Sequence, residues 1–332
     1  MNISYTPESF PVATDNHCRI GPHDRIVLTG AAGLVGQNLV VQLLAQGYRN
    51  LLAIDKHEYN LGMLKTLHSE VEILHADLAE PGPWQNCLAE TSCLVQLQAQ
   101  ITGKETALFV RNNIHATRLV LEATRRHKIP YVVHISSSVV NSVAKDDYTN
   151  TKTDQEQLVI DSGLHHCVLR PTLMFGWFDP KHLGWLSRFM QQVPVFPIPG
   201  HGRYMRQPLY IRDFCRVIIR CMETQPSNAV FDIIGHEQVD YVDIIRAIRE
   251  LKQLRTPIVH IPYPIFYGLL KLYAVFSRNP PFTADQLKAL TAGDEFAGVD
   301  MERDFAITPT PFLEAIRETF TDTHYADVVL KR

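Results

Sequence analysis

The sequence predicts an α/β protein that has a doubly wound parallel sheet and a smaller, mainly helical C-terminal region. Short apolar strands alternate with helical segments from residue 26 to residue 169, which is typical of a parallel sheet covered by helices on both faces. A glycine-rich turn joins the first strand to the first helix. After Arg170 the alternation stops and prolines become frequent, which indicates a different architecture.

The first strand, helix and second strand form one unit. Residues 26–29 are apolar, residues 30–36 read Gly-Ala-Ala-Gly-Leu-Val-Gly, residues 37–46 are amphipathic, and the apolar run 51–54 ends at Asp55. Further strands are predicted at 71–75, 93–99, 131–135, 167–169 and 230–234, and further helices at 60–68, 105–127 and 147–161.

The glycine-rich turn has a spacing that suits a dinucleotide. Gly30 permits a tight turn, Gly33 lets the backbone approach a pyrophosphate, and Gly36 lets the helix pack close to the sheet. Phosphates would bind at the helix N-terminus, where free N–H groups and the helix dipole favour an anion. Because glycines also mark ordinary turns, the surrounding strand, helix and terminal acid carry this interpretation.

Two acidic residues follow neighbouring strands. Asp55 stands where a carboxylate binds a ribose 2′-hydroxyl and would repel a 2′-phosphate, so NAD is predicted in preference to NADP. Asp77 follows the strand 71–75, and two interpretations are open there: a contact with the adenine, or a helix N-cap.

Composition excludes several classes of protein. The chain has 332 residues, enough for one large or two modest domains, and its net charge of −3 gives no sign of a nucleic-acid partner. Its six cysteines have neither CxxC nor metal-ligand spacing, so we expect free thiols in a reducing cytoplasm and no metal site. The N-terminus lacks the basic-then-apolar pattern of a signal sequence.

The longest apolar run covers residues 261–276. It contains two prolines and Lys271, and it is too short and too broken to span a bilayer, so no membrane span is predicted. A buried helix is favoured here over a helix that faces a membrane surface or a partner.

A serine cluster and a Tyr-x-x-x-Lys pair indicate the chemistry. Ser137 follows the strand 131–135, at the sheet edge where open α/β sheets bind ligands. Tyr148 comes eleven residues later, and Lys152 shares its helix face. The lysine charge lowers a phenol pKa towards working pH, so Tyr148 can exchange a proton with a carbinol as hydride moves, while Ser137 orients the same oxygen.

Such a pair is unspecific alone, because the chain has 12 tyrosines. The order of glycine turn, acid, serine cluster and then tyrosine and lysine on the next helix makes it informative. With these motifs the chain resembles the NAD-dependent epimerase/dehydratase family of extended short-chain dehydrogenases/reductases, from about residue 24 to at least residue 236. The resemblance implies a Rossmann fold and the catalytic residues Ser137, Tyr148 and Lys152.

The resemblance also extends the predicted site. It matches Gln96-Leu97-Gln98-Ala99 to a family segment that is usually His-Leu-Ala-Ala, and Asn113 to a helix asparagine. The cofactor-binding residues that it implies, together with those derived above, are Gly30, Ala32, Gly33, Leu34, Val35, Gly36, Asp55, Lys56, Asp77, Leu78, Leu97, Gln98, Ala99, Asn113, Ser136, Tyr148, Lys152 and Pro171.

The implied substrate contacts are Ser138, Leu173 and Arg206. Arg206 lies seven residues before Asp213, where nucleotide-sugar members have an arginine that grips the substrate phosphate; a solvated surface charge is the other interpretation.

The chain also departs from the family pattern. Ser138 and Val139 stand where dehydratases carry Asp-Glu, so the acid–base pair for water elimination is missing. Leu173 stands where sugar epimerases often carry an asparagine, and the segment from Ser137 to Tyr148 is shorter than usual, which reshapes one wall of the substrate pocket.

Three functions are therefore weighed. The first is an NAD-dependent epimerase of a nucleotide-linked sugar, which oxidises a carbinol transiently and returns hydride to the opposite face. The second is an NAD(P)-dependent oxidoreductase with net oxidation or reduction of an alcohol or carbonyl, and the third is a dinucleotide-binding subunit without catalysis. The three retained catalytic residues argue against the third, whereas the first two share the same residues.

The predicted organisation has three parts. Residues 1–22 form an N-terminal extension, residues 23–170 form the NAD-binding domain with a return segment at about 209–236, and residues 171–208 and 237–332 form the substrate-binding region. The resemblance implies a homodimer built from the helices 105–127 and 147–161. We expect a cytoplasmic protein whose substrate is a nucleoside-diphosphate sugar.

Overall fold

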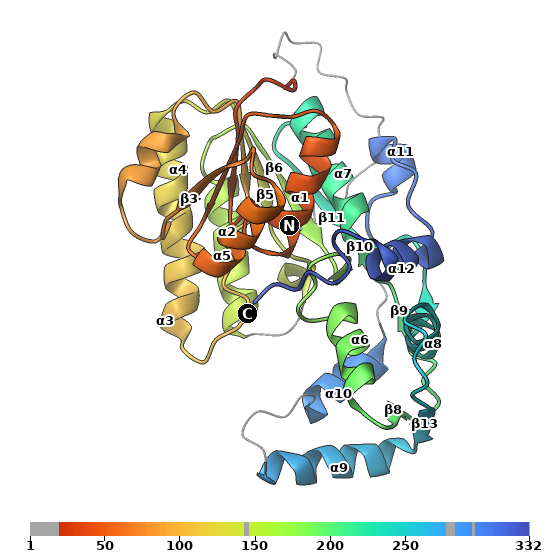
Figure 1. The fold of residues 1–332 in the computed structure, drawn as a ribbon. Coiled ribbons are helices and arrows are strands. Elements are labelled where there is room, and N and C mark those ends of the chain that lie inside the picture. Colours follow the sequence, from red (N-terminus) through yellow and green to blue (C-terminus); the bar gives the residue numbers. More distant parts are fainter. Residues whose placement is uncertain (1–19, 143–145, 277–282, 294–295, 332) are drawn as a thin grey trace.

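The computed structural model describes residues 20–142, 146–276, 283–293 and 296–331 (Figure 1). A seven-stranded sheet carries helices on both faces, and the C-terminal region extends from one end of it. The sheet order is β11-β6-β5-β4-β1-β2-β3, and each neighbouring pair is parallel, which confirms the predicted doubly wound sheet. Residues 1–19 of the predicted extension lie outside the described residues.

The strands follow the apolar runs closely. Their bounds are β1 (Ile26–Thr29), β2 (Leu51–Asp55), β3 (Glu72–His75), β4 (Cys93–Gln96), β5 (Tyr131–Ile135), β6 (His166–Pro171) and β11 (Ala229–Ile233). β11 pairs with β6, so the segment after residue 228 returns to the sheet as predicted. β1 lies between β2 and β4, so the order of the strands reverses beside it. Such a reversal opens a crevice at the carboxyl edge where ligands bind.

Alternating side chains bury the two faces of the sheet. Ile26 and Leu28 pack with α1 (Leu34–Ala45) and α7 (Ile211–Thr224), whereas Val27 packs on the other side with α4 (Ala116–Arg126). α5 (Asp147–Ile160) joins α4 on that second face through Val159. Both faces are therefore dry, which explains why the strands are continuous apolar runs.

The predicted helix 105–127 has a change of pitch. It consists of α3 (Thr106–Phe109), a π-helical segment η2 (Val110–His115) and α4. Such wide turns inside helices are often found at functional sites, and this one carries Asn113. The other elements of this half are α2 (Glu58–Leu67) and the short 3-10 helices η1 (Pro83–Leu88) and η3 (Ser138–Asn141).

The C-terminal region is mainly helical, with three two-stranded pairs. The pairs are β7 (Met174–Phe175) with β10 (Leu209–Tyr210), β9 (Met205–Arg206) with β12 (Val239–Asp240), and β8 (Phe196–Pro199) with β13 (Ile258–Ile261). Its helices are α6 (Leu183–Gln192), α8 (Tyr241–Leu251), α9 (Tyr263–Phe276), α10 (Ala284–Ala292), α11 (Met301–Phe305) and α12 (Phe312–Thr321). The domain boundaries drawn from the sequence stay a prediction.

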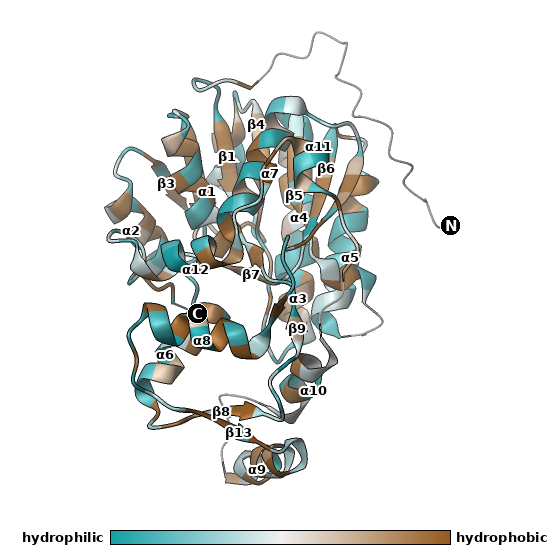
Figure 2. Ribbon diagram, turned by 90° about the vertical axis from the view of Figure 1, so that its right-hand side faces the viewer, coloured by the Kyte–Doolittle hydropathy of each residue, from teal (hydrophilic) through white to brown (hydrophobic). Residues whose placement is uncertain are grey.

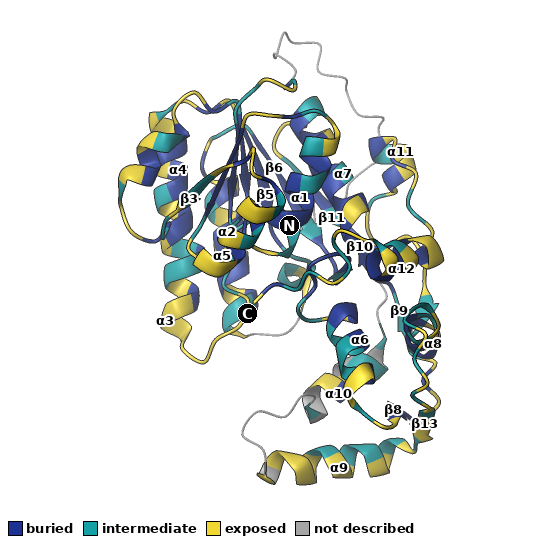
Figure 3. Ribbon diagram, viewed as in Figure 1, coloured by how far each residue is buried: buried dark blue, intermediate teal, exposed yellow. Residues whose placement is uncertain are grey.

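One sequence-based expectation is wrong. Most of the apolar run 261–276 does form a helix, α9, but that helix lies at the far end of the C-terminal region, and the apolar side chains on one of its faces are exposed (Figures 2 and 3). Hydrophobicity alone favoured a buried helix, but nothing in the described part of the chain covers the outer face of α9. Among the described helices, none combines the length and the apolar character that a membrane crossing requires.

Candidate active site

The glycine-rich turn brings three strands together. Gly30 has φ +73°, and a Cβ there would lie 2.5 Å from the backbone nitrogen of Gln98, just beyond β4. A Cβ at Gly36 would lie 2.4 Å from the carbonyl oxygen of Ala31. The close approach predicted for Gly36 is therefore to the turn itself rather than to the sheet. α1 begins at Leu34, directly after the turn, so the N–H groups of its first turn have no helical partner and suit a phosphate.

Asp55, the last residue of β2, bonds to the same glycine-rich turn. Its carboxylate accepts hydrogen bonds from Ala32 N at 3.0 Å and His57 N at 2.9 Å. Lys56 points instead towards η2, where its Nζ donates to Asn112 Oδ1 at 2.7 Å. The predicted ribose acid therefore lies beside the glycine turn, whereas the charge of Lys56 lies 3.9 Å from Asp77.

Ser137 and Tyr148 meet at the carboxyl end of β5. Ser137 is the N-cap of η3, and Tyr148 is the second residue of α5. Burial raises the pKa of Tyr148, a hydrogen bond with Ser137 opposes that rise, and Asp146 adds to it. In the free protein Tyr148 is therefore held as a neutral phenol.

Lys152 is a buried lysine with two neutral acceptors. Its Nζ donates to the carbonyl oxygen of Ile135 at 2.9 Å and to Gln155 Oε1 at 2.6 Å, and the residue is 1% exposed. Burial lowers the pKa of Lys152 to about 7, against an opposing effect of Glu156. The protein therefore holds a lysine that gains or loses its proton near neutral pH.

A chain of buried polar side chains runs from Lys152 into the sheet. Gln155 Nε2 donates to Thr117 Oγ1 at 2.9 Å, and Gln96 Nε2 donates to the same oxygen at 3.0 Å. Gln96 Oε1 lies 3.2 Å from His134 Nδ1. Burial lowers the pKa of His134 well below its usual value, and the charges of Lys152 and His166 lower it further. The chain is neutral apart from Lys152, and it fixes the position of that side chain.

Sequence reasoning missed Gln155 and Thr117. The signal was available for Gln155, since it lies three residues after Lys152 and so shares its helix face. Nothing in the sequence links Thr117 to the site, because it reaches Gln155 only through the packing of α4 against α5.

Helix α5 is anchored by an ion pair to β6. Arg170 Nε donates to both carboxylate oxygens of Glu156, at 3.1 and 3.0 Å, and its Nη2 also donates to Glu156. A two-pronged guanidinium–carboxylate pair is geometrically specific. It therefore fixes the rotation of α5, and with it the direction of Lys152.

The residues around the crevice suit a polar cofactor. The buried polar atoms that have no hydrogen-bond partner among the described residues include Gln98 Nε2, Ser136 Oγ and Thr172 Oγ1. They follow the carboxyl ends of β4, β5 and β6, which are neighbours in the sheet. Because buried polar atoms are normally satisfied, this row of unpaired groups fits a bound molecule with its own donors and acceptors.

Two predicted cofactor residues, Asn113 and Asp77, form hydrogen bonds with neighbouring segments of the protein. Asn113 is fully buried, and its side chain bonds both backbone polar atoms of Gln100 and Thr151 Oγ1. Asp77 accepts from Arg111 Nη1 at 2.8 Å and from Ala79 N at 3.0 Å. Burial opposes ionisation of Asp77, but these hydrogen bonds outweigh it and lower its pKa.

The other predicted residues lie along the same edge. Leu78 is buried in the core beside η1, Leu97 and Ala99 follow β4, and Pro171 ends β6. Val35 lies in the first turn of α1, and Ser138 is the first residue of η3.

The predicted substrate residues lie further out. Leu173 accepts a backbone hydrogen bond from Leu209 at 2.9 Å. Arg206 is half-buried on β9, opposite Val239, and its charge lowers the phenol pKa of Tyr241, against a larger rise from burial. Asp213 ties α7 to the C-terminal segment by accepting from Thr310 N and Oγ1, each at 2.8 Å. Its role is therefore structural in this arrangement.

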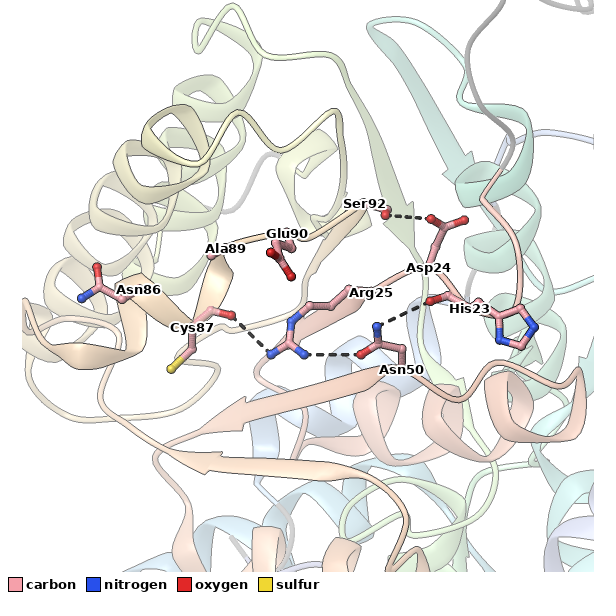
Figure 4. Close-up of a pocket in the computed structure, with 9 residues that line it drawn as sticks. All are labelled: His23, Asp24, Arg25, Asn50, Asn86, Cys87, Ala89, Glu90 and Ser92. Carbon is pink, nitrogen blue, oxygen red and sulfur yellow. Dashed lines mark hydrogen bonds between the residues drawn. The ribbon is translucent and has the colours of Figure 1, made fainter.

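A hollow of about 430 Å³ lies at the opposite, amino edge of the sheet (Figure 4). Arg25 crosses it, with its guanidinium bonded to Asn50 Oδ1 at 3.3 Å, Glu72 Oε2 at 3.1 Å and the carbonyl of Cys87 at 3.5 Å. Ser92 Oγ donates to Asp24 Oδ1 at 2.9 Å. These bonds join the starts of β1, β2, β3 and β4. The residues around the hollow therefore hold the amino edge of the sheet together, far from Ser137, Tyr148 and Lys152.

The described cysteines form no disulfide. Cys87, Cys93, Cys167, Cys215 and Cys221 are free thiols, and Cys18 lies outside the described residues. Within the described ranges, no three His, Cys, Asp or Glu side chains gather as a metal site would require.

The pKa of Lys152 gives a testable pH dependence. Its pKa falls from 10.5 unfolded to about 7 folded, so above pH 7 the unfolded chain binds one more proton at this residue. The free energy of unfolding then rises with pH, by at most about 1.4 kcal/mol per pH unit. In Lys152→Met this contribution is lost, so the stability of the wild type relative to Lys152→Met should increase from about pH 7 to about pH 9 in urea unfolding.

The exposed residue Lys104 provides the control. Stability differences between the wild type and Lys104→Met should not follow this slope. A difference between the wild type and Lys152→Met that stays constant with pH would show that Lys152 keeps an ordinary pKa in the folded protein.

Comparison with known proteins places the chain in a family. A sequence profile described as the NAD dependent epimerase/dehydratase family matches residues 26–233, more than half of the chain. The protein therefore belongs to this family of enzymes, which are of the extended short-chain dehydrogenase/reductase type and use NAD. The family, the fold and the cofactor predicted from the sequence are confirmed.

Individual relatives are distant. A 4-hydroxy-2-methyl-3-oxo-4-farnesyl-3,4-dihydroquinoline-1-oxide ketoreductase of Stigmatella aurantiaca is 23% identical over 262 residues, which cover 72% of this chain and 76% of the ketoreductase. Among solved structures, a UDP-glucose 4-epimerase of Thermotoga maritima with UDP-glucose has a TM-score of 0.69 at 17% identity, covering 88% of this chain and 96% of its own. A UDP-glucuronic acid 4-epimerase of Bacillus cereus in complex with NAD has a TM-score of 0.63 at 24% identity, covering 72% and 87%.

Proposed function

We propose that the protein is an NAD-dependent epimerase of a nucleoside-diphosphate hexose. The observation that carries the proposal is the convergence of Ser137, Tyr148 and Lys152 at the carboxyl end of β5, two strands from the glycine turn that follows β1. The similarity to solved nucleotide-sugar epimerases supports the substrate class. The Ser138-Val139 pair argues against the related dehydration, since it supplies no acid–base couple.

The proposed cofactor site consists of the glycine turn, the first turn of α1 and Asp55. The first two would hold the pyrophosphate, and Asp55 would hold the adenosine ribose. When bound there, NAD would supply the hydride chemistry: it would accept a hydride from the sugar carbinol and return it to the opposite face of the resulting ketone.

The proton transfer belongs to the chain itself. Tyr148 would take the proton of the carbinol hydroxyl and give it back when the ring has turned. The hydrogen bond of Ser137 and a protonated Lys152 both favour the phenolate that this transfer needs. Gln155 and the Ile135 carbonyl would hold the Lys152 ammonium in place, because each offers an acceptor oxygen to its Nζ.

The substrate would extend from this centre into the C-terminal region. Arg206 on β9 is the basic residue proposed to bind the diphosphate, since one guanidinium can donate hydrogen bonds to two phosphate oxygens at once. A homodimer through α3, η2, α4 and α5 and a cytoplasmic location remain predictions from the sequence.

The fate of the hydride tests the reaction. The full-length protein is purified, and the nucleotide released on denaturation is identified; an epimerase should retain NAD close to one per chain, because the cofactor is regenerated in every turnover. UDP-hexoses with deuterium at C4 are then supplied without added cofactor. We expect the C4 epimer to form with its deuterium retained.

A different outcome would favour the second function. If the protein is purified without nucleotide, and added NADH or NADPH is consumed in proportion to product, the enzyme is a net oxidoreductase, as the ketoreductase relative is named. Preference for NADPH would also contradict the role proposed for Asp55.

A further inference from the structure

Helix α9 presents a continuous apolar stripe to the outside. Ile265, Leu269, Leu272 and Phe276 recur at helical spacing, and they are 56%, 51%, 58% and 82% exposed. We call these four residues the α9 stripe. Tyr273, beside it, is 51% exposed. Soluble proteins rarely leave so many large apolar side chains together in water, so the stripe indicates a surface that is covered in use.

The opposite side of α9 already has its contacts. Tyr263, Phe266, Tyr267 and Leu270 recur at the same spacing and are half-buried, and α9 packs against α10. Figures 1 and 3 show the helix at the extremity of the C-terminal region, below the β8–β13 pair and away from the sheet that carries the site. The stripe therefore faces away from the protein, and covering it need not obstruct the crevice.

The charge around α9 is one-sided. From Arg255 to Ala284 the sequence has three basic residues, Arg255, Lys271 and Arg278, and no acidic one, and the neighbouring α10 adds Asp285 and Lys288, which offset each other. Lys271 Nζ lies 5.7 Å and Lys288 Nζ 5.9 Å from the centre of the Tyr267 ring. The occupant of the stripe should therefore be anionic as well as apolar.

We propose that the α9 stripe docks on an anionic phospholipid membrane, with the helix lying in the plane of the surface. Apolar side chains on one face, flanking lysines and interfacial tyrosines are the features of helices that lie in a membrane interface. α9 has 14 residues, so its length is about 21 Å, less than the roughly 30 Å of a bilayer core. The helix thus fits on the surface rather than across it.

A second copy of the chain is the competing occupant. Pairing two α9 stripes would bring together two helices that each carry Lys271 and no carboxylate. Like charges placed opposite each other at an interface oppose association. An anionic lipid surface meets the same basic residues with opposite charge, which is why we choose it.

Vesicle co-sedimentation of the full-length protein tests the proposal. One set of vesicles is phosphatidylcholine alone, and in the other about a third of the lipid is phosphatidylglycerol. We expect the protein to sediment with the anionic vesicles and to be released by salt of about 0.5 M. The double variant Leu269→Asp/Leu272→Asp should bind at least about tenfold more weakly, because two side chains no longer enter the lipid.

The control places the same change elsewhere. Leu313, on α12, is 65% exposed and lies outside the stripe, so Leu313→Asp should sediment as the wild type does. NAD binding should be unchanged in all variants, which shows that they are folded. Failure of the wild type to sediment with anionic vesicles, or an equal loss in Leu313→Asp, would overturn the proposal. A second result would also overturn it: the wild type does not bind vesicles and forms a dimer in analytical ultracentrifugation, and the double variant is a monomer.

Discussion

Replacing Tyr148 by phenylalanine should lower kcat by about a thousandfold, because the variant keeps the ring but has no group that can exchange a proton with the carbinol. The ring packs at the carboxyl end of β5, where burial raises the pKa of the phenol, so the fold should tolerate the change. The measurement is steady-state turnover of the best UDP-hexose substrate, together with the amount of NAD bound.

Tyr59→Phe is the matched control. Tyr59 is 49% exposed on α2, and Lys331 stacks 3.5 Å above its ring, a contact that phenylalanine preserves. Its kcat should equal that of the wild type. If kcat of Tyr148→Phe falls by less than about tenfold, another group transfers the proton and the assignment is wrong.

The largest effect on cofactor binding is expected at Gly36. A methyl group there would lie 2.4 Å from the Ala31 carbonyl oxygen and 2.5 Å from its Cα, and both belong to the backbone of the glycine turn. Gly36→Ala should therefore push the turn away from α1, lower the free energy of unfolding by about 1–3 kcal/mol and weaken NAD binding about a hundredfold. Calorimetry and thermal unfolding with and without NAD measure both effects.

Gly62→Ala makes the same change in an open place. A Cβ at Gly62, inside α2, would meet nothing within 4 Å. That variant should be more stable than the wild type by about 0.5–1 kcal/mol, since alanine suits a helix better, and should bind NAD normally. Equal NAD affinity in the two variants would mean that the glycine turn does not form the pyrophosphate site.

Much of the sheet and the cofactor turn could be predicted from the sequence because their signals are local. The run from Ile26 to Asp55 contains strand, turn, helix and acid within one segment, and each signal supports the next. The placement of Lys152 on the same helix face as Tyr148 was also predicted from local spacing. The hydrogen bond of Lys152 to Gln155 was not, although the spacing of three residues allowed it.

The features that were missed depend on contacts between distant segments. Hydrophobicity shows that the run from Tyr263 to Phe276 is apolar, but only the tertiary structure shows that no described element covers Leu272 or Phe276. Likewise, the two hydrogen bonds between Asp213 and Thr310 join residues that are almost a hundred positions apart in the sequence. Neither outcome is encoded in a local pattern.

The hydrogen bonds of Arg25 at the amino edge of the sheet separate the residues that stabilise the fold from those proposed for catalysis. Its bonds to Asn50, Glu72 and the Cys87 carbonyl hold the strand starts together, while the strand ends supply the serine and the support for the lysine. The residues that stabilise the sheet and the residues proposed for catalysis thus lie at opposite edges, and a substitution at one edge need not affect the other. A substitution in the C-terminal region that changes substrate preference therefore leaves both edges of the sheet in place.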